Sequence, residues 1–189
     1  MIIDNKGFLK IFFAIILTIA VIAYGVVFGQ RYFENQKKAE NEVVISSFKE
    51  CAEAGFSVLK TYPAQCKTDE GQLFVEDVGN AVAKKGLIDL YSPQPNHKIS
   101  APLKLEGRAR GYWYFEGDFP IEVLHNGQVI GEGIGMAQGE WMTEDFVAFE
   151  AELYFNSPGS GTGLLILKRD NPSGLPENDD QLTVPIVFE

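Results

Sequence analysis

Thiol and imidazole groups are the side chains best suited to redox, nucleophilic and zinc chemistry, and this chain holds only two of each. Cys51 and Cys66 would close a loop of about 16 residues, worth on the order of 3 kcal/mol in the chain-entropy model. An even cysteine count in a chain with an apolar N-terminal segment favours this disulfide. Free thiols and metal or redox chemistry stay open as alternatives. His97 and His125 lie far along the chain and are expected in exposed turns.

Glycine-rich runs and paired carboxylates are the other patterns that could do chemistry. Residues 131–135 and 159–163 have the glycine spacing of phosphate-binding loops, but neither leads from a predicted strand into a helix. Turns or bulges between strands explain them better. The adjacent carboxylates at residues 144–145 and 179–180 could serve a glycosidase. Acidic residues are so abundant in this chain, however, that chance adjacency is the better explanation. We therefore expect no catalytic residue, no cofactor and no metal site, and we predict that the protein is not an enzyme.

Acidic loops near the C-terminus keep one alternative open. Their oxygen-bearing side chains are the kind of ligand that Ca²⁺ prefers, although the spacing matches no EF-hand and Pro172 and Pro176 interrupt it. Binding of Ca²⁺ or of a small ligand is therefore the alternative to a purely structural or adhesive role. The side chains concerned are Asp170, Asn171, Glu177, Asn178, Asp179 and Asp180.

A long apolar run precedes all of these groups. Residues 11–28 carry no charged side chain, and 18 residues in a helix span about 27 Å, close to the hydrocarbon thickness of a bilayer. We predict a transmembrane helix over residues 11–29 and a cytoplasmic tail over residues 1–10. A cleaved signal peptide is the alternative, but its apolar region is normally about 7–15 residues long.

The orientation of this anchor follows from the short basic tail. Lys6 and Lys10 precede the run, as in a signal-anchor that leaves the tail inside and exports the rest. Lys/Arg counts on the two sides are similar, so the charge rule alone does not decide the orientation. The cysteine pair supports an extracytoplasmic location. We predict a single-pass protein of the cell membrane with its C-terminal domain outside the cytoplasm.

Residues 30–86 form a predicted juxtamembrane stem. The pattern over residues 35–54 favours a helix that ends at Gly55, a residue suited to a C′ position. Short strands are predicted over residues 56–60 and 72–75. The stem is therefore expected to be a small helix that the Cys51–Cys66 disulfide links covalently to a hairpin.

Residues 87–189 have a different sequence pattern, in which short apolar or alternating runs are separated by Gly, Pro and Asn. Asn126-Gly127 is a strong signal for a type I′ hairpin turn. Pro185 places the last strand at an edge or a bulge, because proline has no N–H for the ladder. Trp113 and Trp141 are expected to fill the core. The strands are predicted at 88–91, 103–109, 113–115, 121–125, 129–134, 147–155, 163–168 and 182–188, which is typical of an immunoglobulin-like antiparallel β-sandwich.

The charge distribution limits the partners. The formal net charge is −10, and residues 87–189 hold six Lys/Arg against sixteen Asp/Glu. Residues 1–86 hold ten of each kind. A domain without a basic surface is unsuited to nucleic acid and to anionic lipid headgroups. We expect no nucleic-acid partner.

Two stretches resemble known families. The first is carried by Ile88, Ser92, Pro93, Pro95, Asn96, Ile99, Ser100, Ala101, Pro102, Leu103, Gly107, Ala109, Arg110, Trp113, Phe115, Glu116, Gly117, Asn126, Gly127, Phe149, Leu153, Phe155, Gly161, Gly163, Val184, Pro185 and Ile186. Their order resembles Gmad2, the immunoglobulin-like domain of bacterial spore germination proteins, over about residues 87–189. The resemblance implies an extracytoplasmic interaction or structural module without catalytic residues, and it does not by itself imply a role in spores.

The second resemblance covers the stem. It is similar to a short Cys-containing module found beside the membrane anchor in predicted surface proteins of some bacteria, and it carries no known chemistry. The residues are Cys51, Gly55, Tyr62, Pro63, Cys66, Thr68 and Gly71. Together these features predict a mainly β, membrane-anchored protein of a bacterial cell envelope, which presents its immunoglobulin-like domain to an envelope protein or a wall component.

Overall fold

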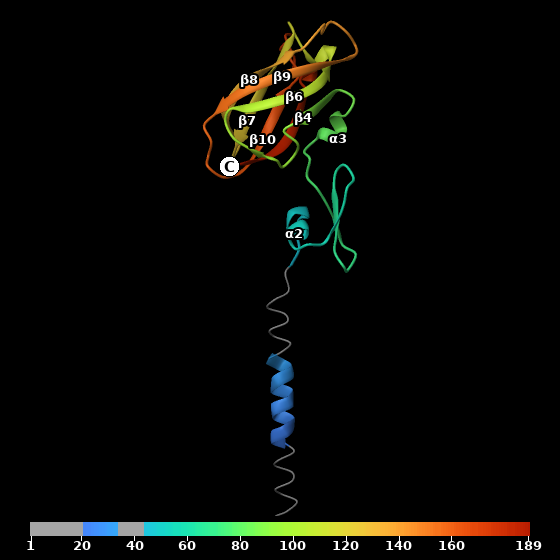
Figure 1. The fold of residues 1–189 in the computed structure, drawn as a ribbon, viewed down its shortest axis with the longest axis vertical. Coiled ribbons are helices and arrows are strands. Elements are labelled where there is room, and N and C mark those ends of the chain that lie inside the picture. Colours follow the sequence, from blue (N-terminus) through green and yellow to red (C-terminus); the bar gives the residue numbers. More distant parts are fainter. Residues whose placement is uncertain (1–20, 34–43) are drawn as a thin grey trace, which may run out of the picture. The chain divides into compact units, whose positions relative to one another are not determined.

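The computed structural model describes residues 21–33 and 44–189, which divide between two compact units, Met1–Ile45 and Ser46–Glu189 (Figure 1). Residues 21–33 are helical. The predicted cytoplasmic tail over residues 1–10 and the first half of the predicted transmembrane helix over residues 11–29 lie outside the described residues. Within the described ranges, no helix is both long enough and apolar enough to cross a membrane.

The second unit begins with helix α2, Phe48–Glu53. Its first turn is fixed by Ser47, whose hydroxyl accepts a hydrogen bond from the N–H of Glu50 at 3.2 Å. The N–H and hydroxyl of Ser46 donate to the Glu50 carboxylate and lower the pKa of that group. The predicted helix over residues 35–54 is therefore too long in its described part, because these serines start the helix at Phe48. Its predicted end is confirmed, since Gly55 has φ 84°.

A three-stranded sheet follows, with β1 (Ser57–Leu59), β2 (Gln65–Lys67) and β3 (Leu73–Val75) in that order. The disulfide between Cys51 and Cys66 is confirmed and joins α2 to β2. Both cysteines are fully buried, so the bond lies at the centre of the packing between α2 and this small sheet. Strand β2 was not predicted, because only one of its three side chains is buried and so short a strand gives no readable alternation.

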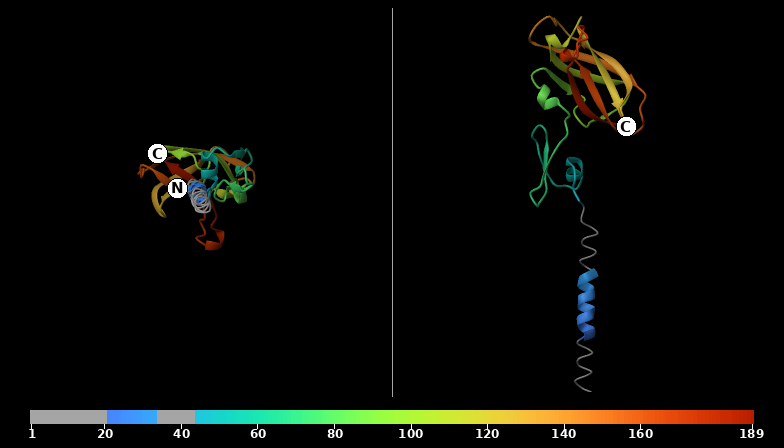
Figure 2. Two further views of the ribbon diagram at one scale, coloured as in Figure 1. Left: turned by 90° about the horizontal axis from the view of Figure 1, so that it is seen from below. Right: turned by 180° about the vertical axis from the view of Figure 1, so that it is seen from behind.

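The remaining strands form one eight-stranded sheet in the order β4-β6-β9-β8-β7-β10-β11-β5. The prediction of a mainly β fold is confirmed, and the strands curl around a common core (Figures 1 and 2). All neighbours are antiparallel except β5 and β11, which pair in parallel. The bounds are β4 (Ile88–Ser92), β5 (Lys98–Ile99), β6 (Leu103–Arg110), β7 (Asp118–His125), β8 (Gln128–Ala137), β9 (Phe146–Phe155), β10 (Gly161–Lys168) and β11 (Gln181–Phe188).

The core is formed by the alternate side chains that point to the inner face of the sheet. In β6, Leu103, Leu105 and Ala109 are buried while the residues between them are exposed, as a half-buried strand requires. Phe119 of β7 and Phe149 of β9 meet edge to face with ring centroids 5.0 Å apart. Trp113 is fully buried, and Trp141 is partly buried against the same core, as predicted.

The predicted strand at residues 113–115 is wrong. Gly111–Trp113 form a 3₁₀ turn, η1, because the chain passes very close to the loop before β9. A Cβ on Gly111 would lie 1.9 Å from the carbonyl oxygen of Thr143, so only glycine fits there. The short helices α3 (Ala81–Lys84) and η2 (Pro176–Asn178) were not predicted either. The hairpin turn at Asn126-Gly127 is confirmed, with φ 50° and 75°.

The outer edge of β11 is covered by two preceding segments. Thr183 N–H donates to the side-chain oxygen of Asn80 at 2.7 Å, and Asn80 N–H donates to the Thr183 carbonyl at 3.2 Å. The Asn80 amide also donates to the Gln181 carbonyl at 2.9 Å. Farther along, Pro185 has no N–H to satisfy, and its carbonyl accepts from Asn96 N–H at 2.8 Å. The last strand is therefore not at the edge of the sheet as predicted, because β5 pairs with its end, but Pro185 itself lies where β5 does not reach.

Replacing Asn80 with alanine should destabilise the domain. The change leaves the partly buried Thr183 N–H without its acceptor, and we expect a loss of about 2 kcal/mol in the free energy of unfolding, measured by denaturant titration. Asn156→Ala is the matched control, since the side chain of Asn156 makes no hydrogen bond within the described residues and lies at an exposed strand end. Equal stability of the two variants would contradict the role given to Asn80.

Candidate functional site

The histidines do not form a site. His97 is exposed in the loop before β5, as predicted. His125 is half-buried instead of exposed, because its ring lies edge-on against Phe188 with centroids 5.3 Å apart. Its Nδ1 lies 3.1 Å from the Thr162 carbonyl, and its Nε2 lies 2.9 Å from the Asn126 amide. These contacts fix the β7–β8 turn against β10 and β11, which is a structural role.

The glycine-rich runs lie in and beside strands. Residues 131–135 are a regular part of β8 and not a turn or bulge, although the register with β7 shifts next to them, between Val123 and Leu124. Gly131, Gly133 and Gly135 are there because large core side chains occupy the space of a Cβ: a Cβ on Gly135 would lie 2.4 Å from Phe119. The run at residues 159–163 is a bend at residues 159–160 followed by the first three residues of β10. Neither run has a helix at its end that could cradle a phosphate.

Four of the six side chains in the acidic loops contact other groups in the described part of the protein, and the exceptions are Asp170 and Glu177. Asp179 accepts a hydrogen bond from the Asn171 amide at 2.7 Å. Asp180 forms an ion pair with Lys84 of α3 and accepts from Gln181 N–H. Asn178 donates from its side chain to Ser173. Among the residues that the structure describes, no three His, Cys, Asp or Glu side chains lie together as metal ligands would.

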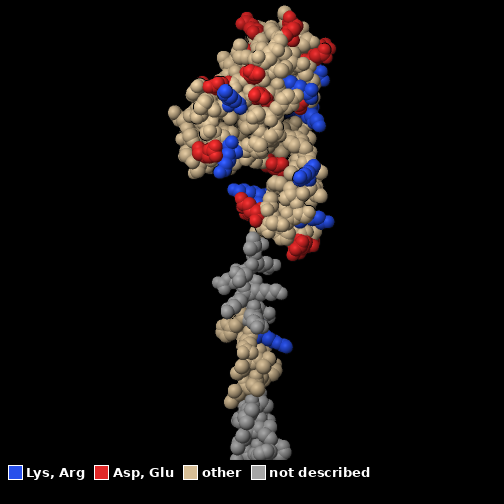
Figure 3. Space-filling view, viewed as in Figure 1, with Lys and Arg blue, Asp and Glu red and all other residues tan. Residues whose placement is uncertain are grey.

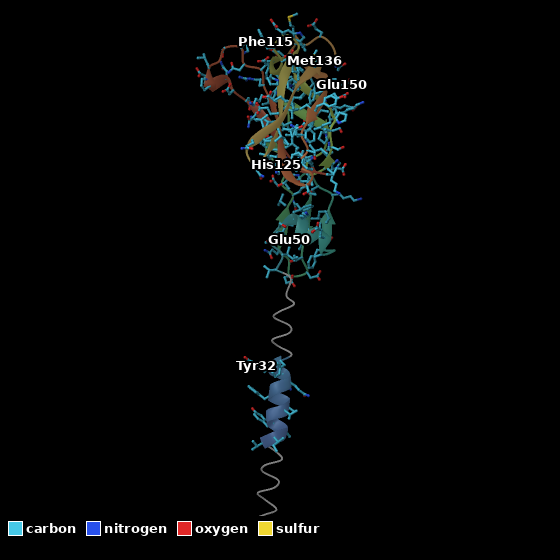
Figure 4. All side chains as sticks on the ribbon, turned by 90° about the vertical axis from the view of Figure 1, so that its left-hand side faces the viewer. Tyr32, Glu50, Phe115, His125, Met136 and Glu150 are labelled. Atoms are coloured by element: carbon cyan, nitrogen blue, oxygen red, sulfur yellow. A yellow bond between two sulfur atoms is a disulfide. The ribbon has the colours of Figure 1, made fainter. Side chains whose placement is uncertain are left out.

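The outer side of the neighbouring strands β6, β9, β8 and β7, which we call the outer face, combines exposed apolar side chains with carboxylates, some of which make no ion pair within the described residues. The register aligns four of its residues in one row across the sheet. Glu106 of β6 is opposite Glu150 of β9, Glu150 is opposite Met136 of β8, and Met136 is opposite Asp118 of β7. Figure 4 shows Met136 and Glu150 beside each other at the end of the domain that also carries Phe115.

The apolar side chains on this face are large and open to solvent. Ile134 is 53% exposed and Met136 is 52% exposed, and they lie two residues apart on the same side of β8. An open groove of about 500 Å³ runs beside them. It is lined by Lys104, Leu105, Glu106, Ile134, Met136, Gln138, Glu150, Ala151 and Glu152.

The carboxylates on the outer face differ in how they are compensated. Glu152 is opposite Lys104 and accepts a hydrogen bond from the Tyr154 hydroxyl, which raises the pKa of Tyr154. Glu122, which faces Glu132 across the β7–β8 ladder, forms an ion pair with Lys168. In contrast, no ion pair within residues 21–33 and 44–189 includes Glu106, Glu150 or Asp118. Acidic side chains are spread over the part of the domain surface drawn in Figure 3.

The inner side of β8 explains why its outer side is apolar. Because three alternate positions on the inner side are glycines, the strand contributes few core side chains and instead makes room for Phe119, Leu153 and Phe155 from its neighbours. The apolar side chains of its central part, Ile134 and Met136, point outward. The sequence signal for this was the alternation Gly-x-Gly-x-Gly inside a strand, which we interpreted as turns or bulges, so the outer face was missed.

Replacing Gly135 with alanine should disturb the domain by overpacking. The added methyl group would meet the buried ring of Phe119, and we expect a loss of about 1–3 kcal/mol in the free energy of unfolding. Gly139→Ala is the matched control, because no atom lies within 4 Å of the position that its added methyl group would take and its backbone is not left-handed. Chemical denaturation of the two variants compares them directly, and an unaffected Gly135→Ala protein would show that β8 is not packed as described.

Comparison with known families gives one match. Residues 87–174 match the family model described as the immunoglobulin-like domain of bacterial spore germination, Gmad2. The resemblance predicted from the sequence is therefore confirmed over these residues, which include β4 to β10. No curated protein and no solved structure matches the chain.

Proposed function

We propose that this protein, whose residues 87–174 match the Gmad2 immunoglobulin-like domain, is a membrane-anchored protein of a bacterial cell envelope that binds a partner through that domain outside the cytoplasm. The apolar run at residues 11–28 supports the anchor, since its length suits a bilayer. The Cys51–Cys66 disulfide supports the location, because such bonds persist in oxidising compartments. The family's description supports an interaction role.

The observation that carries this proposal is the outer face. Isolated exposed apolar residues are normal, but Ile134 and Met136 lie together beside a groove and within a polar surround. Methionine is enriched at protein interfaces, and an apolar centre with a polar rim is the usual anatomy of such a surface. Between the two kinds of partner expected from the sequence, this favours a protein over a wall glycan.

A binding role also agrees with the ionisable groups whose pKa is shifted. Burial raises the pKa of Tyr114 to about 12, and its hydroxyl donates to the Val147 carbonyl at 2.8 Å. The hydrogen bond with Asp89 raises the pKa of Arg108. Both shifts come from contacts that hold the sheet together, and neither group has the environment of a catalytic acid or base. We therefore propose a non-enzymatic function.

The location is tested by fusing alkaline phosphatase after residue 40. The enzyme folds only where its own disulfides form, so we expect an active fusion that sediments with the membrane fraction and resists carbonate extraction. A β-galactosidase fusion at the same position is the opposite control and should be inactive. An inactive phosphatase fusion paired with an active galactosidase fusion would place the domain in the cytoplasm and refute the envelope location.

The binding role is tested by site-specific photo-cross-linking in living cells. A benzophenone side chain in place of Met136 should give one discrete adduct with another protein. The same probe at Leu164 is the matched control, because Leu164 is also an exposed apolar strand residue, at 40%, but is opposite Leu124 and Pro185 and has no charged cross-strand partner. If position 136 gives no more adduct than position 164, the outer face is not an interface.

A further inference from the structure

We infer that the outer face binds a cationic segment of a partner protein, one in which an apolar side chain is flanked by Lys or Arg. This inference rests on the proposed interaction function and names the chemistry of the partner. It starts from the groove and from the exposed side chains of Ile134 and Met136. A partner can bury these two side chains only by placing an apolar side chain of its own against them.

The charge around the groove identifies what accompanies that apolar side chain. Glu106 and Glu150 lie on one side of Met136 in the row, and Asp118 lies on the other. Neighbouring strands are about 4.8 Å apart, so the row from Glu106 to Asp118 spans about 14 Å. A segment that places its apolar side chain at Met136 therefore meets carboxylates on both sides within the reach of a Lys or Arg side chain.

The row is unfavourable without such a partner. Like charges directly opposite one another destabilise a sheet, and Glu106 and Glu150 form such a pair. No cation of the described chain forms an ion pair with them, and Lys104, which lines the same groove, is opposite Glu152. A cationic side chain from outside would remove this repulsion, so binding gains from the relief of charge repulsion as well as from the contact itself.

The arginines of β6 do not serve this purpose. Arg108 follows Glu106 on the same face of β6, but its guanidinium binds Asp89 on the far side and lies 4.3 Å from the ring centroid of Phe146. Arg110 also stacks on Phe146, at 4.1 Å. Both arginines are thus drawn away from the groove, which leaves its carboxylates available.

A second copy of this chain is a poorer occupant. Residues 87–189 carry sixteen acidic against six basic residues, so two such domains repel each other. Four of the basic side chains are already committed to intramolecular contacts: Arg108 and Arg110 as above, Lys168 with Glu122, and Arg169 with the Asn178 carbonyl. A separate, basic protein segment complements the face better.

The test measures binding of labelled peptides to the full-length protein in a non-ionic detergent. The probe is the heptapeptide KVKVKVK, with QVQVQVQ and EVEVEVE as charge controls. We expect KVKVKVK to bind at least about tenfold more tightly than the neutral peptide and to lose affinity as salt rises from low to physiological concentration. The double variant Glu106→Gln, Glu150→Gln should bind about tenfold more weakly. The double variant Glu70→Gln, Glu177→Gln removes the same charge from exposed positions elsewhere and should bind normally.

The outcomes separate this inference from the proposed function. Loss of the Met136 cross-link in cells carrying Glu106→Gln, Glu150→Gln, with the Glu70→Gln, Glu177→Gln cells unaffected, supports the cationic partner. An undiminished cross-link in the first variant, with no preference for KVKVKVK, overturns the inference and leaves the interaction function standing. An adduct between two copies of this chain overturns it in favour of self-association. A rise in melting temperature with Ca²⁺ that needs Glu106 and Glu150, without peptide binding, overturns it in favour of a cation site.

Discussion

The outer edge of β11, which β5 covers only at Val187 and Phe188, is the constraint on which the C-terminal domain depends. An eight-stranded curled sheet has two edges, and an exposed edge invites pairing with another chain. Here Asn80 and the loop at Asn96 supply the hydrogen bonds that a neighbouring strand would have supplied, and Pro185 removes one N–H that would need a partner. Because Asn80 immediately precedes α3, the same bonds also attach the end of the stem to the sheet. The hydrogen bonds of Asn80 thus both cover the edge and position the stem.

The second constraint lies in β8, whose glycines allow the side chains of β7 and β9 to meet across it. Phe119 and Phe149 come from strands on either side of β8, yet their rings are in contact. A side chain at Gly135 would occupy the space of Phe119. The core beside the centre of β8 is thus filled by its neighbours, and the apolar side chains of that central part, Ile134 and Met136, are left for the outer surface. Packing of the interior and exposure of Ile134 and Met136 have the same cause.

Elements with many alternating residues could be predicted from the sequence, and elements fixed by distant contacts could not. Strand β9 alternates over ten residues, and Asn126-Gly127 specifies its own turn, so both follow from local rules. Helix α3 has four residues and is held by Asn80, whose partner Thr183 is 103 residues away. The parallel pairing of β5 depends equally on β11. The outer face needs the register of four strands, and no local pattern contains that register.

The acidity of the outer face is a local property and does not follow from the charge of the domain alone. Elsewhere the sheet neutralises comparable groups: Lys168 of β10 reaches the Glu122 that faces Glu132, and Arg108 reaches Asp89. An equivalent cation beside Glu106 and Glu150 would fit the same architecture, and Arg108 is only two residues from Glu106. Its guanidinium instead turns toward Asp89 and the Phe146 ring. Arg108, which could have neutralised the carboxylates of Glu106 and Glu150, is therefore directed away from them. As a result, the exposed Ile134 and Met136 of β8 stay bordered by carboxylates that have no ion-pair partner within the described residues.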